Sequence, residues 1–371
     1  MKKKITVLKG DGIGPEVIDQ ALQVLNAIED RFDHHFELDF QLIGAAAIDE
    51  TSSPLPDGTL HACLNSDAIL LGAVGDPKYD NDPNATIRPE QGLLALRKEL
   101  GLFCNVRPVK LYKSLSHLSP LKSERLNNVD FVVYRELTGG IYFGEKKSDG
   151  SNQFASDLCS YSRPEIERIA HLAFQEAQKR NKRMCLVDKA NVLETSRLWR
   201  AVVKDIATDY PDVELDFMFV DNAAMQIIMN PGQFDVVLTE NMFGDILTDE
   251  ASVLSGSLGL LASSSKGNEH ALFEPIHGSY PQAKGKDIAN PIASVLSVAM
   301  MMDHFDMIEE AEVIRAAVDT CLNNKIFTKD LDEHNYIPCS KMGEIISEII
   351  LSEDCEVLNI DKMVANMSTI I

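Results

Sequence analysis

The sequence predicts an α/β fold in which a central sheet is flanked by helices. Short apolar runs, typical of buried strands, alternate along the chain with longer segments whose apolar residues recur at helical spacing. This alternation is the pattern of a sheet covered by helices. With 371 residues, of which 45% are hydrophobic, the chain is also long enough for two domains that share a large buried core.

The individual elements follow from these patterns in chain order. The uninterrupted apolar run 68–74 is typical of a strand that is buried on both faces of a parallel sheet. We expect strands at residues 5–8, 36–43, 68–74, 130–135, 184–188, 215–220 and 235–239. We expect helices from Pro15 through Ile28 and at residues 93–100, 164–180, 195–210, 290–304, 308–324 and 341–351. Long polar loops are expected at 75–90, 144–162 and 263–286, and residues 354–371 suggest no element.

The net charge of −22 argues against nucleic acid and anionic membrane as partners, so an anionic substrate would need a local basic cluster. The seven cysteines include no C-x-x-C pair, which is typical of reduced thiols in a cytoplasmic protein. We expect no signal peptide, because charge returns too soon after the first apolar residues, and no membrane span.

Two aspartates in the segment 240–259 are the first candidates for chemistry. The strand 235–239 is followed by Asn241 and Gly244, which suggest a turn, and we expect a helix with Asp245 in its first turn. Asp249 lies four residues later, so both carboxylates share one helix face. Their oxygens suit Mg²⁺ or Mn²⁺, although the spacing alone is more often a solvated acidic face.

The segment GDGIG at residues 10–14 invites comparison with a dinucleotide fingerprint, but the third glycine position is Pro15 and no acidic residue ends the next strand. A tight turn between strand and helix is therefore favoured. The glycine-rich stretch 274–291 could hold a phosphate or adenosine through backbone amides, although the pattern alone is weak.

Basic and hydroxyl side chains beside strand ends complete the candidates. Arg97, Arg107 and Arg135 could together bind two carboxylates by charge-assisted hydrogen bonds, although each alone suggests a surface residue. The proton carriers would be Tyr142 and Lys189, whose alternative roles are a strand-surface tyrosine and a partly buried lysine. A third metal carboxylate could come from Asp221, which could equally cap the helix expected at 222–230. These alternatives stay open from the residues alone.

In this order, the clusters resemble the isocitrate/isopropylmalate family of metal-dependent β-decarboxylating dehydrogenases. The resemblance covers nearly the whole chain and is carried by the segments GDGIGPE, LLALRKELGLFCNVRP, RELTGGIYFG, DKANVL, NMFGDILTDEAS, GSLGLL, EPIHGS and GKDIANP. It implies two α/β domains with a mixed central sheet, unlike a Rossmann fold. The first, cofactor-side domain would span 1–103 plus 256–371 and the second 104–255, with 144–162 as an arm that pairs between subunits.

The resemblance also implies the roles of individual residues in a site that is shared across a homodimer. The arginines would bind substrate, Tyr142 and Lys189 would be catalytic, and Asp245, Asp249 and Asp221 would hold the metal, with Lys189 and Asp221 contributed by the partner. Further substrate contacts would be Asp221, Leu93, Leu94, Glu90 and Val192. The NAD contacts would be Asp76, Glu90, Glu274, His277, Gly278, Ser279, Gln282, Gly285 and Asn290.

The expected activity is NAD-dependent oxidative decarboxylation of 3-isopropylmalate with Mg²⁺ or Mn²⁺, a step of leucine biosynthesis. Leu93 and Leu94 stand where isocitrate-using relatives present polar residues, which favours an apolar substituent. Gln282 stands where NAD-using relatives carry an aspartate; it brings no positive charge for NADP, although Lys284 is near. The alternatives are malate, tartrate or homoisocitrate as substrate, and a non-catalytic regulatory subunit.

Overall fold

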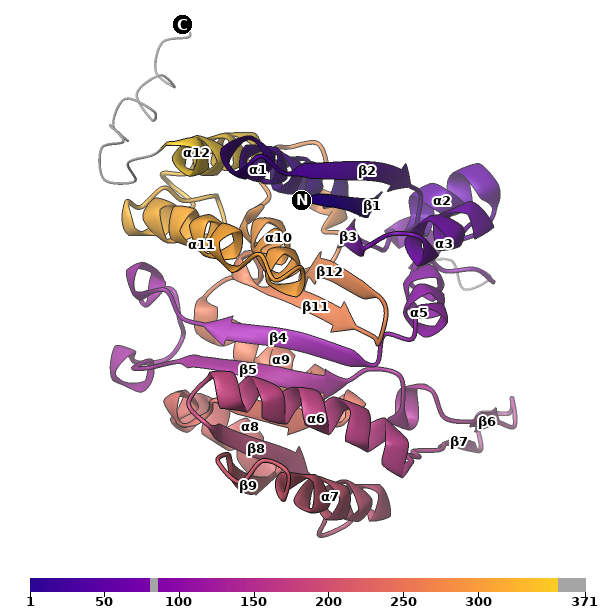
Figure 1. Cartoon of the computed structure of the whole chain (residues 1–371). Coiled ribbons are helices and arrows are strands. Elements are labelled where there is room, and N and C mark those ends of the chain that lie inside the picture. Colours follow the sequence, from indigo (N-terminus) through magenta and orange to yellow (C-terminus); the bar gives the residue numbers. More distant parts are fainter. Residues whose placement is uncertain (81–85, 353–371) are drawn as a thin grey trace, which may run out of the picture. The chain divides into compact units, whose positions relative to one another are not determined.

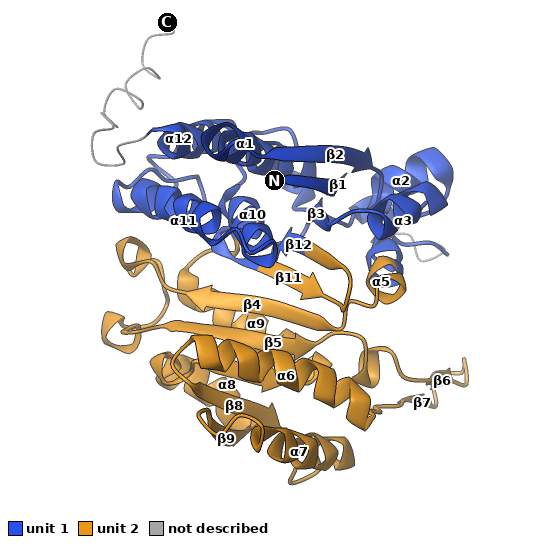
Figure 2. Ribbon diagram, viewed as in Figure 1, with its two compact units in different colours: residues 1–95, 259–262, 273–371 blue, residues 96–258, 263–272 orange. Residues whose placement is uncertain are grey.

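The computed structural model describes residues 1–80 and 86–352 and divides into two compact units (Figure 2). Unit 1 comprises residues 1–95, 259–262 and 273–371, and unit 2 comprises residues 96–258 and 263–272. The α/β class is confirmed, and the sheet is mixed. The strand Cys104–Lys110 (β4) runs antiparallel to Asp130–Glu136 (β5) and Ala262–Lys266 (β11), whereas Lys2–Gly10 (β1), for example, pairs in parallel with His35–Gln41 (β2). Residues 81–85 of one expected loop, and the stretch 354–371, lie outside the described residues.

Unit 1 contains both ends of the described chain and the strand order β2-β1-β3 (Figure 1). Its long first helix forms because apolar residues recur every three to four positions and are buried along one face. The strands are β1 (Lys2–Gly10), β2 (His35–Gln41), β3 (Ala68–Ala73) and part of β12 (Ala271–Pro275). The helices are α1 (Gly14–Phe32), α2 (Gly44–Thr51), α3 (Asp57–Leu64), α4 (Pro77–Asp80), α10 (Ile292–His304), α11 (Ile308–Asn323) and α12 (Cys339–Leu351).

Unit 2 has the strand order β11-β4-β5-β10-β8-β9, with α6 and α7 in front of the sheet in Figure 1 and α8 and α9 behind it. The strands are β4 (Cys104–Lys110), β5 (Asp130–Glu136), β8 (Arg183–Asp188), β9 (Glu214–Phe219), β10 (Val236–Thr239) and most of β11 (Ala262–Lys266). The helices are α6 (Arg163–Lys179), α7 (Glu194–Ala207), α8 (Val220–Met229) and α9 (Asn241–Ser252); α5 (Pro89–Glu99) crosses the boundary between the units. A short hairpin of β6 (Lys146–Ser148) and β7 (Ala155–Asp157) occupies the loop expected at 144–162.

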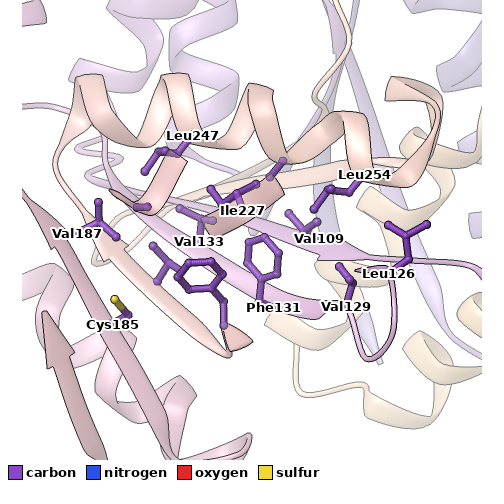
Figure 3. Close-up of a cluster of buried hydrophobic side chains, with 14 residues drawn as sticks. Val109, Leu126, Val129, Phe131, Val133, Cys185, Val187, Ile227, Leu247 and Leu254 are labelled. Atoms are coloured by element: carbon purple, nitrogen blue, oxygen red, sulfur yellow. The ribbon is translucent and has the colours of Figure 1, made fainter. Parts of the chain in front are cut away.

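A buried apolar cluster fixes α8 and α9 against the sheet of unit 2 (Figure 3). Phe131 and Val133 of β5 face Leu247 of α9 and Ile227 of α8 within this cluster. Each fully buried side chain of this size contributes about 1.5–3 kcal/mol, so together they hold α9 firmly in place. The opposite face of α9 is thereby left for polar residues.

Three expectations about local structure are wrong. The turn expected before Asp245 is helical, because α9 already begins at Asn241 and places Asp245 in its second turn. Gly244 serves close packing there, since a Cβ at this position would lie 2.6 Å from Arg135 Cγ. The helix N-cap next to Asp221 is Phe219, so Asp221 lies within the first turn of α8 and does not cap it.

The expected loop 263–286 begins with strand structure, in β11 and β12. Serines fill β11, and their low strand propensity concealed it, whereas burial against neighbouring strands stabilises it. No described helix is long and apolar enough to cross a membrane.

Candidate active site

Strand alternation places two of the three candidate arginines on the α9 side of the sheet. Successive side chains of a strand point to opposite faces, so Arg135 follows Phe131 and Val133 of β5 toward α9. By the same rule Arg107 follows Val109 of β4. Both guanidinium groups therefore meet the polar face of α9.

Asp245 lies at the centre of this face. One of its oxygens accepts a hydrogen bond from Arg135 Nη1, and the other accepts a bond of 2.9 Å from the Tyr142 hydroxyl. The Arg135 guanidinium lies over the Tyr142 ring, 5.9 Å from its centroid. A candidate substrate arginine, a candidate proton carrier and a candidate metal carboxylate are thus brought together.

Asp249 lies one helical turn further and meets the second arginine. Arg107 Nη1 donates to the Thr248 hydroxyl at 2.6 Å and lies 3.3 Å from an Asp249 oxygen. The Asp249 side chain is 72% exposed and that of Asp245 37%, so both carboxylates are accessible to a ligand from solvent.

Positive charge converges on Arg135. Burial, together with the charges of Arg107 and Arg97 and against that of Asp245, lowers the pKa of Arg135 to about 10. Burial and the hydrogen bond to Asp245 raise the pKa of the Tyr142 hydroxyl, so that it stays protonated at neutral pH. The arrangement is suited to attracting a dianion and donating a proton to it.

Lys189 and Asp221 form a separate pair. Lys189 Nζ donates to Asp221 Oδ1 at 2.6 Å, and this contact lowers the pKa of Asp221. Arg200 binds both oxygens of the preceding Asp188 at 2.8 Å, which fixes the end of β8 from which Lys189 emerges. Within the described residues no group of three or more histidine, cysteine or acidic side chains could hold a metal, so one chain does not bring Asp221 to Asp245 and Asp249.

The residues expected beside the third substituent of the substrate are accessible. Glu90, Leu93, Leu94 and Arg97 follow one another on α5 at the spacing of one helix face. Leu94 is 48% exposed and Val192, in unit 2, is 60% exposed, so neither side chain is part of a buried core. An exposed leucine on this face is available to an apolar ligand group.

Most of the expected cofactor contacts lie on neighbouring loops of unit 1. The backbone of Ser279 accepts a hydrogen bond from Ile13 at 2.8 Å, and a Cβ on Gly75 would lie 2.9 Å from Glu90 Oε1 and 3.5 Å from Ser279 Oγ. His277 Nε2 is buried without a protein partner, as a ligand-binding group can be. Gln282 and Gly285 are exposed, whereas Glu274 and Asn290 are buried.

Asp11, which the sequence patterns did not indicate as a site residue, organises these loops. Its carboxylate is 5% exposed and accepts hydrogen bonds of 2.9 Å from the backbone N–H groups of Ala45, Ala46 and Gly75. It thus joins the start of α2 to the loop that carries Asp76. The only signal was an aspartate between two glycines at the end of β1.

Glu240, directly before α9, supports a prediction about stability. Its side chain is 5% exposed, and burial raises its pKa to about 7, with the Cys159 thiol opposing this and the charge of Glu136 adding to it. Ionisation of Glu240 should therefore destabilise the fold as pH rises between about 4.5 and 7. The free energy of unfolding should fall by about 3 kcal/mol over this range, as the size of the pKa shift requires. We expect Glu240→Gln to remove this loss.

Urea denaturation from about pH 4 to about pH 8 measures this difference. The free energy of unfolding of Glu240→Gln should exceed that of the wild type by an amount that grows with pH. Glu312→Gln, at an exposed position of α11, is the matched control and should show no such growth. A constant difference between Glu240→Gln and the wild type would contradict the buried ionisation.

Comparison with known proteins gives a consistent result. The family described as isocitrate/isopropylmalate dehydrogenase matches residues 4–346. A relative from Bacteroides fragilis, 3-isopropylmalate dehydrogenase, is 54% identical over 331 residues, which are 89% of this chain and 93% of the relative. The enzyme of the same name from Priestia megaterium is 53% identical over 359 residues, 95% of this chain and 97% of that one.

Solved structures agree. The crystal structure of isocitrate dehydrogenase from Methylococcus capsulatus superimposes with a TM-score of 0.84 at 34% identity, covering 94% of this chain and all of that one (100%). The resemblance found in the sequence is therefore confirmed, and the chain belongs to the isocitrate/isopropylmalate dehydrogenase family.

Proposed function

We propose that the chain oxidises and decarboxylates (2R,3S)-3-isopropylmalate to 4-methyl-2-oxopentanoate with reduction of NAD, a step of leucine biosynthesis. The curated relatives named 3-isopropylmalate dehydrogenase support this assignment. The observation that carries it is the contact of Asp245 with both Arg135 and Tyr142, which joins an anion-binding group, a candidate metal ligand and a proton donor.

The substrate carboxylates would bind to the arginine cluster. Arg97 and Arg107 both lie close enough to Arg135 for their charges to act on it. Charge-assisted hydrogen bonds to such groups contribute about 1.5–3 kcal/mol each, enough to select a dianion on a protein of negative net charge.

Asp245 and Asp249 fit a divalent cation, because their accessible oxygens are the hard ligands that Mg²⁺ and Mn²⁺ prefer. Asp221 would be the third carboxylate. When bound, the cation would polarise the substrate hydroxyl and stabilise negative charge on that oxygen after CO₂ is lost.

Two side chains would move protons. Lys189 Nζ would take the proton of the substrate hydroxyl, and its contact with Asp221 keeps it beside a candidate metal ligand. Tyr142 Oη would return a proton to the carbon that has lost CO₂, for which its raised pKa keeps it protonated.

Specificity for the isopropyl group would come from Leu93 and Leu94 together with the partner subunit's Val192. Burial of this group in an apolar pocket contributes about 2–3 kcal/mol, whereas an unpaired carboxylate there would cost several kcal/mol. The loops around Ser279 fit NAD, which would accept the hydride, and exposed Gln282 brings no positive charge for the extra phosphate of NADP.

We further propose a cytoplasmic homodimer with a shared site, in which Lys189 and Asp221 act in the partner's site and the β6–β7 hairpin pairs between subunits. Met225, Ile228 and Met229 of α8 are each about half exposed, as is Ile246 of α9 beside Asp245, and they provide an apolar surface for association. The free cysteines of the described chain suit a reducing compartment.

The test is NADH formation from 3-isopropylmalate, isocitrate and malate with Mg²⁺ or Mn²⁺, repeated with NADP. We expect kcat/KM for 3-isopropylmalate with NAD to exceed that for isocitrate by at least about 10²-fold, because the apolar pocket cannot pair a third carboxylate. Preference for another 2-hydroxy acid would refute the pocket, and preference for NADP would refute the role of Gln282. No turnover with any substrate would make a regulatory subunit the better explanation.

A further inference from the structure

Asn241 occupies an unusual position for a polar side chain. It is the first residue of α9, its side chain is 1% exposed, and it lies four residues before Asp245 on the same helix face. A buried amide is costly unless its hydrogen bonds are satisfied, so its partners indicate why it is there.

The amide of Asn241 joins two parts of the proposed site. Its Oδ1 accepts hydrogen bonds from Arg135 Nε at 3.1 Å and Nη2 at 2.8 Å. Its Nδ2 donates to the backbone oxygen of Gly139 at 3.1 Å. One side chain therefore contacts both the guanidinium at the end of β5 and the turn that follows it.

That turn carries Tyr142. Gly140 and Tyr142 bound a single 3₁₀ turn, and a Cβ on Gly140 would lie 2.4 Å from Tyr161 Oη. The Tyr161 hydroxyl accepts a hydrogen bond of 3.0 Å from the Asn241 backbone N–H. The Tyr161 ring and the side-chain amide of Asn241 thus hold the start of the turn from two directions.

The contacts of Asn241 are arranged to leave Arg135 ready for a carboxylate. Of the five N–H groups of this guanidinium, Asn241 takes two and Asp245 takes one, which leaves one on each terminal nitrogen. A guanidinium with N–H groups available on both terminal nitrogens can bind a carboxylate with two hydrogen bonds. Because an amide is neutral, Asn241 orients the guanidinium without neutralising its charge.

We propose that Asn241 is a positioning residue that sets both the orientation of Arg135 and the place of Tyr142. The proposal rests on the function proposed above. It predicts that loss of the amide weakens substrate binding and slows the proton step together, because both effects pass through one side chain.

A matched variant exists in the same unit. Asn105 is also 1% exposed, and its Nδ2 donates to the Ser263 hydroxyl and to the backbone oxygen of Ser264 in β11. Its Oδ1 accepts a hydrogen bond from Arg107 Nε at 2.8 Å. Its amide thus orients a substrate arginine but has no bond to the Tyr142 turn. Asn241→Ser and Asn105→Ser remove equivalent buried amides.

The experiment compares KM and kcat for 3-isopropylmalate in the two serine variants and measures hydrogen–deuterium exchange in residues 137–143. We expect both variants to raise KM about tenfold, and only Asn241→Ser to lower kcat about tenfold and to speed exchange in that segment. Asn241→Asp, which places a carboxylate against Arg135, should raise KM more than Asn241→Ser does.

Unchanged kcat and unchanged exchange in Asn241→Ser would overturn the proposal, as would equal changes in both serine variants. If the wild type turns over none of the substrates, the proposed function fails separately. The exchange measurement then still decides whether Asn241 holds the Tyr142 turn, and an unfolded serine variant is replaced by Asn241→Asp in the same assay.

Discussion

Replacement of Lys189 by methionine is expected to lower kcat for 3-isopropylmalate by about 10³-fold, within the range that a positioned general base contributes. Methionine keeps the length of the side chain but cannot accept the hydroxyl proton or bind Asp221, which Lys189 contacts at 2.6 Å. Steady-state kinetics at saturating metal and NAD measure the loss. The control Lys204→Met removes an exposed lysine of α7 that lies over the Phe217 ring, as Lys189 lies over the Phe219 ring, and it should retain activity.

Mixing Lys189→Met with Tyr142→Phe subunits tests whether the site is shared. If each site takes Tyr142 from one chain and Lys189 from the other, a hybrid dimer contains one intact site, and activity returns from two inactive parents. If both residues act within one chain, no hybrid site is intact. Subunit exchange confirmed by mass spectrometry without recovery of activity would therefore refute the shared site.

Asp245→Asn is expected to lower kcat by at least about 10²-fold, the scale on which loss of one electrostatic stabiliser acts. The substitution removes a hard anionic ligand, so the remaining activity should require a higher concentration of Mg²⁺ or Mn²⁺. Titration of activity with each ion after treatment with a chelator measures both effects.

Asp303→Asn is the matched control for this change. The Asp303 side chain is 35% exposed and pairs with Arg315, much as Asp245 is 37% exposed and pairs with Arg135. The control should leave the metal response intact, because Asp303 lies on α10 of unit 1 and is not one of the proposed ligands. Equal losses in the two variants would mean that Asp245 matters for stability alone.

The sequence predicted those features that depend on local pattern. Asp245 and Asp249 share one face of α9 because four residues make about one helical turn, and this spacing is visible without a structure. The buried strand at 68–74 was likewise evident from its unbroken apolar run and appears as β3. The specific motifs along the chain indicated the family, which no single residue spacing could have done.

Features that depend on distant residues could not be predicted in this way. The local pattern predicts a turn at Asn241 and not its buried role, because its partners, Arg135 and Gly139, lie about a hundred positions earlier in the chain. The serine-rich strand β11 has low intrinsic propensity and forms only because its neighbours bury it. Asp221 caps no helix, because β9 ends at Phe219 and α8 already begins at Val220.

The way in which Asp11 binds its neighbours has a consequence for engineering. Its carboxylate contacts Ala45, Ala46 and Gly75 only through their backbone N–H groups. The frame around the cofactor loops is therefore independent of the side chains that those loops carry. Side chains at the start of α2 and on the loop after Gly75 can thus be exchanged while the frame that Asp11 holds is retained.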